Sequence, residues 1–148
     1  MLSIKLPTLA ATETLAVRIA RLARAGDAIL LEGPLGAGKT TFARAFLREA
    51  CGEPALDVPS PSYTLVQTYA TPRFRVHHFD LWRLDGPHAL AELGWEDARA
   101  DLVLVEWADR LGVLRPGDAL IIMLAAGLHA DARRATLAGW PDRIRALA

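Results

Sequence analysis

The chain has 148 residues, of which 52% are hydrophobic and 23% charged, and its formal net charge is zero. This length predicts a single domain, residues 1–148, and the balanced charge argues against a strongly basic protein that holds nucleic acid along an extended track. Cys51 is the only cysteine, so no internal disulfide forms and we expect a reducing, cytoplasmic setting. We expect no signal peptide, because the N-terminus lacks a basic region followed by an apolar one. We also expect no membrane span, because the apolar runs are too short.

Two short elements open the chain. Residues Ser3–Leu6 have the composition of a strand, and Ala10–Ala25 has the spacing of a helix with one apolar face. Thr8 and Thr12 are competing candidates for the N-cap of this helix. Gly26 is placed to end it, since glycine adopts the left-handed conformation that often follows a helix.

The next segment carries the strongest pattern in the sequence. Ile29–Leu31 is an apolar run typical of a buried strand, and Gly33–Thr40 reads GPLGAGKT, which fits G-x-x-x-x-G-K-[ST] at every fixed position. The residues that follow have helical spacing to about Ala50, and Gly52 is expected to close that helix. The pattern therefore lies between a strand and a helix, where a phosphate-binding loop requires it.

The chemistry of such a loop assigns roles to its residues. Glycines let successive backbone N–H groups point at one anion, and the helix N-terminus adds partial positive charge. Lys39 can reach the β- and γ-phosphates, and the Thr40 hydroxyl can bind Mg²⁺. A glycine-rich turn that matches by chance is the alternative, and the flanking elements argue against it. The predicted nucleotide-binding residues are Gly33, Gly36, Ala37, Gly38, Lys39, Thr40 and Thr41.

The middle of the chain alternates loops with short elements. Glu53–Pro61 is rich in proline and is predicted to be a loop. Thr64–Tyr69 and Phe74–Phe79 have strand composition and are separated by a turn, which favours a β-hairpin. His88–Leu93 and Trp95–Ala100 are long enough for one or two helical turns each.

The last third of the chain returns to apolar strands. Leu102–Val105 is a continuous apolar run, typical of a parallel strand covered on both faces. Gly112–Gly117 is predicted to be a turn, Ala119–Leu124 a strand, Arg134–Ala138 its partner, and Pro141–Leu147 a closing helix. The whole pattern predicts an α/β P-loop NTPase-like fold with a central, mostly parallel sheet, an added β-hairpin and flanking helices.

A phosphate-binding loop needs an acid to complete the shell of the metal, usually at the end of a neighbouring buried strand. Glu106 follows the most apolar strand of the chain, and Asp80 follows the strand that ends at Phe79. A carboxylate at a strand end is often only a solvated cap, so the sequence alone leaves both acids as candidates for the metal ligand. The apolar character of Leu102–Val105 favours Glu106.

Three further polar features lie near these strands. Ser60–Thr64 holds three serine or threonine hydroxyls and a proline, which suits either an ordinary turn or a switch that orders over a γ-phosphate. His77 and His78 are adjacent, so in a strand they face opposite ways. We expect packing or hydrogen bonding for them rather than metal binding, because no cysteine or third histidine has ligand spacing.

Taken together, five segments of the sequence resemble one family. They are Gly33–Thr41 (GPLGAGKTT), Ser60–Val66 (SPSYTLV), His78–Leu84 (HFDLWRL), Leu104–Trp107 (LVEW) and Gly112–Pro116 (GVLRP). In order and spacing they resemble the TsaE family, also called YjeE, a bacterial ATPase that supports threonylcarbamoyl-adenosine (t6A) modification of tRNA. Ser62 departs from the more usual threonine but keeps the hydroxyl. The match is loose from Leu128 to Arg134, which leaves little support for a nucleotide role of Arg133 or Arg134.

The resemblance implies a set of site residues. Lys39 and the loop backbone would hold ATP, and Thr40 and Glu106 would hold Mg²⁺. Asp80 would lie in a second, catalytic switch, so that Asp80, Glu106 and Lys39 form the catalytic group. The first switch would comprise Ser60, Ser62, Tyr63 and Thr64. Arg83 and Arg110 could act on the γ-phosphate within the chain, but nothing in the sequence places them there.

The resemblance also implies partners and a slow activity. The partners would be TsaD and TsaB, which carry out the transfer chemistry, with tRNA reached through their complex. ATP hydrolysis would be slow in the isolated protein and stimulated by these partners.

Two other readings of the phosphate-binding loop compete. A small-molecule or nucleotide kinase shares the loop, but it needs an acceptor pocket and an arginine-bearing lid, and no such insertion is apparent. A small GTPase needs a guanine-reading N-K-x-D segment. Lys5 and Lys39 are the only lysines, so that segment is missing in its usual form.

Overall fold

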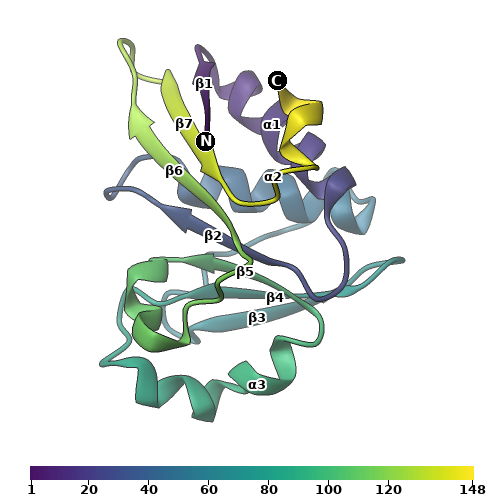
Figure 1. Cartoon of the computed structure of the whole chain (residues 1–148), viewed down its shortest axis with the longest axis vertical. Coiled ribbons are helices and arrows are strands. Elements are labelled where there is room, and N and C mark those ends of the chain that lie inside the picture. The colour runs from purple at the N-terminus through teal and green to yellow at the C-terminus, as the bar shows by residue number, and fades with distance from the viewer.

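The computed structural model describes residues Met1–Ala148. Its centre is a seven-stranded sheet with the order β1-β7-β6-β2-β5-β4-β3, and helices lie against it (Figure 1). The strands are β1 (Leu2–Leu6), β2 (Ala28–Glu32), β3 (Val66–Ala70), β4 (Arg75–Asp80), β5 (Leu102–Glu106), β6 (Leu120–Ala126) and β7 (Arg133–Ala138). The helices are α1 (Leu9–Leu22), α2 (Lys39–Cys51) and α3 (Trp95–Ala98).

The four central strands β6, β2, β5 and β4 are parallel, and the outer strands pair antiparallel. The predicted mostly parallel centre and the predicted hairpin, β3–β4, are therefore confirmed. Parallel strands bring their carboxyl ends to one edge of the sheet. At this edge, Glu106 at the end of β5 pairs with Leu31 on β2 and with Asp80 on β4, so the register places both candidate acids beside the loop that follows β2.

Each face of the sheet covers its own apolar cluster, which explains the continuous apolar runs. Leu31 and Leu104 belong to the cluster on the side of α1 and α2. Leu30 and Val105 face the other side, under α3 and the 3₁₀ stretches Pro87–Leu93 and Ala108–Leu114. Figure 1 shows α2 and α3 on opposite sides of the sheet. None of the helices is long and apolar enough to cross a membrane.

The first helix is shorter than predicted. Thr8 is its N-cap, where the hydroxyl accepts a hydrogen bond from the N–H of Ala11, and the helix ends at Leu22 instead of Ala25. The Asp27 carboxylate accepts a hydrogen bond from the N–H of Arg24 at 2.6 Å, and this side-chain turn competes with the next helical turn. Gly26 lies in that turn with φ +90°.

Other boundaries also differ from the prediction. Strand β3 begins at Val66 rather than Thr64, because Leu65 has a left-handed backbone with φ +69°. The predicted turn Gly112–Gly117 overlaps the 3₁₀ stretch Ala108–Leu114, which is interrupted at Gly112. The predicted closing helix is reduced to a 3₁₀ turn, Ile144–Leu147, which buries its two terminal side chains against the core.

Candidate functional site

The loop between β2 and α2 has the backbone that its glycines permit. Gly33, Gly36 and Gly38 have φ of +138°, +80° and +105°, and a Cβ on Gly33 would collide with the carbonyl oxygen of Leu124 on β6. Gly38 begins α2 without any capping side chain. The N–H groups of the first helical turn therefore lack intrahelical acceptors and remain available to an anion.

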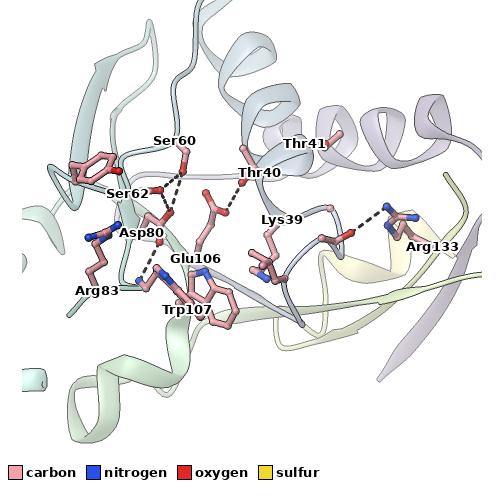
Figure 2. A pocket seen from close by; sticks show the side chains of 15 residues that line it. Lys39, Thr40, Thr41, Ser60, Ser62, Asp80, Arg83, Glu106, Trp107 and Arg133 are labelled. Carbon is pink, nitrogen blue, oxygen red and sulfur yellow. Dashed lines mark hydrogen bonds between the residues drawn. The ribbon is translucent and has the colours of Figure 1, made fainter. Parts of the chain in front are cut away.

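A cavity of about 500 Å³ opens beside this loop (Figure 2). From the loop and α2 it is lined by Leu35, Gly36, Gly38, Lys39, Thr40 and Thr41, with Arg133 of β7 on the same side. The rest of the lining is Ser60, Ser62, Tyr63, Asp80, Trp82, Arg83, Glu106 and Trp107. Three predicted residues do not line it. Gly33 packs against β6, Ala37 is buried in the core, and the Thr64 hydroxyl accepts a hydrogen bond from the Gln67 amide.

Glu106 is the candidate acid that contacts the loop. The Thr40 hydroxyl donates to Glu106 Oε1 at 3.0 Å, and His78 Nε2 lies 2.7 Å from Glu106 Oε2. The carboxylate is buried, with 2% of Glu106 exposed. A buried carboxylate needs such partners, because the loss of hydration is otherwise costly.

Asp80 holds the loop that was predicted as a switch. Its Oδ2 accepts hydrogen bonds from the hydroxyls of Ser60 at 3.0 Å and Ser62 at 3.2 Å, and its Oδ1 accepts from the N–H of Trp82 at 3.1 Å. Figure 2 shows these bonds on the side of the cavity opposite Lys39. Asp80 therefore joins the end of β4 to the segment Ser60–Thr64, while Glu106 joins β5 to the phosphate-binding loop.

Lys39 is folded against its own loop. Its Nζ donates to the carbonyl oxygens of Gly33 at 2.6 Å and Pro34 at 2.9 Å and lies 4.1 Å from the ring centroid of Trp107. Trp107 follows Glu106 directly and has a left-handed φ of +58°. Burial lowers the pKa of the Lys39 ammonium, and the opposing effect of the nearby carboxylates, Glu106 foremost, is smaller. The ammonium is poorly hydrated, so its attraction to an anion in the cavity is less screened.

Five residues of the cavity wall were not among the predicted site residues: Leu35, Arg133, Trp107, Trp82 and Arg83. Arg133 reaches from β7 and donates to the carbonyl oxygens of Ala37 at 3.0 Å and Gly36 at 3.2 Å. The sequence offered little support for a nucleotide role of either arginine; in the structure Arg133 holds the loop backbone directly, and the Arg134 side chain hydrogen-bonds to the Ser3 hydroxyl at 3.5 Å.

The remaining cations near the cavity stack on aromatic rings. The Arg83 guanidinium lies 4.6 Å from the ring centroid of Tyr63. Arg110 lies outside the cavity lining and donates to the carbonyl oxygen of Leu84. Trp107 follows the carboxyl end of β5, and Trp82 and Arg83 follow that of β4. This edge position is the signal in the sequence that could have placed all three beside the loop.

Comparison with known proteins agrees with this geometry. The family model described as "Threonylcarbamoyl adenosine biosynthesis protein TsaE" matches residues 6–135. The chain belongs to the TsaE family. The resemblance seen in the sequence is thereby confirmed, and it places the chain in a family of tRNA threonylcarbamoyladenosine biosynthesis.

Several TsaE relatives are similar over most of this chain. The tRNA threonylcarbamoyladenosine biosynthesis protein TsaE of Rickettsia felis is 42% identical over 99 residues, which cover 66% of this chain and 57% of that protein. The protein of the same name from Nostoc sp. is 33% identical over 122 residues, covering 78% of this chain and 73% of that one. The match thus spans little more than half the length of the Rickettsia felis relative.

A solved structure has the same architecture. The crystal structure of Bacillus subtilis YdiB superposes with a TM-score of 0.74 at 27% sequence identity, over 99% of this chain and 90% of that chain. The agreement over nearly the full length supports the α/β fold with its seven-stranded mixed sheet.

Proposed function

We propose that this chain is an ATPase of tRNA t6A biosynthesis that binds ATP with Mg²⁺ in the cavity beside the phosphate-binding loop. It would serve a tRNA-modifying complex of TsaD and TsaB, and reach tRNA through that complex. The observation that carries the proposal is the contact between Thr40, at the start of α2, and the buried Glu106, at the end of the neighbouring strand. Membership of the TsaE family supports the pathway.

The residues present suit a nucleotide phosphate. The uncapped first turn of α2 offers N–H donors, and Lys39 offers a buried cation that can turn from the Gly33 and Pro34 carbonyls toward a phosphate oxygen. Helix N-termini and lysine together are a common arrangement for binding phosphate.

The residues also suit Mg²⁺. The Thr40 hydrogen is donated to Glu106, which leaves the lone pairs of the hydroxyl oxygen for a cation. No group of three or more His, Cys, Asp or Glu side chains in the chain could hold a metal by itself. This fits Mg²⁺, which is usually bound by one or two protein oxygens together with phosphates and water. When bound, the ion would neutralise charge on the β- and γ-phosphates.

Asp80 would act on the opposite side of the cavity. We assign it the positioning of the attacking water, because its carboxylate lines the cavity and is an acceptor. Its Oδ2 is held by Ser60 and Ser62, so the orientation of Asp80 depends on how the segment Ser60–Thr64 lies. A movement of that segment would therefore change the orientation of Asp80 toward the attacking water.

The isolated protein is expected to hydrolyse ATP slowly, and the TsaD–TsaB complex is expected to raise the rate. Tyr63 is 83% exposed, and within the chain only Arg83 stacks on it. A partner that orders this segment or supplies an arginine could accelerate phosphoryl transfer by about 10³-fold or more. The test is steady-state hydrolysis with and without the complex, with tRNA varied separately.

Substitutions of Ser60, Tyr63 and Thr64 should weaken this stimulation more than they weaken ATP binding. Fast turnover by the protein alone, unchanged by the complex, would contradict the proposal. Turnover that is fast only when a small phosphate acceptor is added would favour a kinase instead.

The Arg133→Ala variant is expected to bind ATP about tenfold more weakly. The substitution removes two hydrogen bonds that hold the carbonyls of Gly36 and Ala37, each worth about 0.5–1.5 kcal/mol, and the loop would have to be ordered by the nucleotide. Calorimetry measures the change in Kd. Arg134→Ala is the matched control, since its side chain hydrogen-bonds to Ser3 and not to the phosphate-binding loop. Equal losses in both variants would show that general charge, and not the loop contact, determines the affinity.

A further inference from the structure

His78, which contacts Oε2 of Glu106, has no role in the function proposed so far. His78 lies on β4 and is completely buried, and its Nε2 is 2.7 Å from Glu106 Oε2. The other oxygen, Oε1, accepts from Thr40. Each oxygen of this carboxylate therefore has one partner, one from α2 and one from β4.

In the hydrogen bond between His78 and Glu106, the histidine is the donor. An ionised carboxylate only accepts, so Nε2 of His78 must carry the hydrogen. The other ring nitrogen, Nδ1, is buried and has no partner. The bond to Glu106 is therefore the one hydrogen bond of this ring. His78 then acts toward Glu106 as a fixed, buried donor.

The strand places this donor where it can act. His78 pairs with Leu104 and Asp80 pairs with Glu106 across β4 and β5, so His78 reaches Glu106 diagonally, two residues along the sheet. Residues two apart on a strand share a face. Strand β4 therefore presents both His78 to Glu106 and Asp80 to the segment Ser60–Thr64.

We propose that His78 is a positioning residue, which fixes the Glu106 carboxylate so that Glu106 in turn holds Thr40 in the orientation that binds Mg²⁺. The inference rests on the proposed function and adds a residue to it. Without the donor, the Glu106 side chain can rotate and release the Thr40 hydroxyl. Substitution of a residue that orients a metal ligand typically lowers metal affinity about 10- to 100-fold.

The test compares three variants of His78 with the wild type. H78L fills the site without a donor, H78Q carries an amide nitrogen that can reach Glu106, and H78N carries the same amide on a shorter side chain. The measurement is the Mg²⁺ concentration that half-saturates binding of a fluorescent ATP analogue at fixed nucleotide. We expect this concentration to rise about 10- to 100-fold in H78L and H78N and to return most of the way to wild type in H78Q. Affinity measured without Mg²⁺ should be the same in all four proteins.

The adjacent histidine provides a matched control. His77 bonds to Asp101 at 2.9 Å and to Thr68 at 3.2 Å and does not line the cavity, so H77L should keep the wild-type Mg²⁺ requirement. If H78L does not fold, H78N against H78Q gives the same comparison.

The inference is overturned if H78L or H78N keeps the wild-type Mg²⁺ requirement, or if H77L shifts it as much as H78L does. It is also overturned if H78Q shows no recovery. Binding by the wild type that does not respond to Mg²⁺ would instead refute the proposed function, and the inference with it.

Discussion

Lys39→Ala is expected to weaken ATP binding about 100-fold. The loss of a charge-assisted contact to phosphate costs about 1.5–3 kcal/mol, and each 1.4 kcal/mol corresponds to about tenfold in affinity. The effect falls at the upper end of this range because the Lys39 ammonium is buried, with 5% of the residue exposed, where charges interact more strongly than in water. Calorimetry with ATP and Mg²⁺ measures the loss.

The chain supplies a control for this substitution. Lys5 is the only other lysine, lies on β1 and does not line the cavity, so Lys5→Ala should leave ATP affinity unchanged. Thermal unfolding of both variants separates binding from stability, since Lys39 also bonds to the Gly33 and Pro34 carbonyls. Equal ATP affinity and turnover in Lys39→Ala and the wild type would contradict the assignment of the phosphate-binding loop.

Glu106→Gln is expected to reduce ATP hydrolysis by about 10²–10³-fold, the range found when one preorganised electrostatic group is removed from an active site. The substitution keeps the size of the side chain, so the fold should survive. It removes the negative charge and turns one of the two acceptors, which now face Thr40 and His78, into a donor. Single-turnover hydrolysis measures the chemical step, and circular dichroism checks the fold.

Asp80→Asn is the informative comparison. It should also slow turnover, but with a smaller effect on binding of ATP with Mg²⁺, because Asp80 contacts Ser60 and Ser62 and not the phosphate-binding loop. If Glu106→Gln hydrolyses ATP normally while Asp80→Asn cannot bind Mg²⁺, the roles of the two acids are exchanged.

The parts of the fold that local pattern determines could be predicted from the sequence. Strand β5 is buried at every position, and a continuous apolar run signals such a strand. The phosphate-binding loop needs particular residues at fixed spacing, which makes it visible without a structure. The end of α1 could not be predicted in the same way, because the Asp27 carboxylate that bonds to Arg24 is itself held by Arg143, 116 residues later.

In the candidate site, too, the features set by local sequence could be predicted, and those set by contacts between distant residues could not. The sequence indicated that Asp80 or Glu106 faces the loop, but both end neighbouring parallel strands in direct register, so only side-chain contacts distinguish them. Arg133 lies 96 residues from Ala37, whose carbonyl it binds, and no local pattern reports such a contact. The partnership of His78 with Glu106 is equally non-local and was foreseen only as packing or hydrogen bonding.

The left-handed backbone at Leu65 and Trp107 has a consequence for engineering the protein. Such a conformation costs a non-glycine residue about 1–3 kcal/mol and persists only where the surroundings enforce it. Leu65 follows the segment Ser60–Thr64, and Trp107 follows Glu106, so this strain lies at two points where the chain leaves the candidate site. Glycine at either position would relax the backbone, but at Trp107 it would also remove the ring beside Lys39. Efforts to make this protein more heat-resistant should therefore begin away from these two residues, since the strained backbone at each adjoins residues of the candidate site.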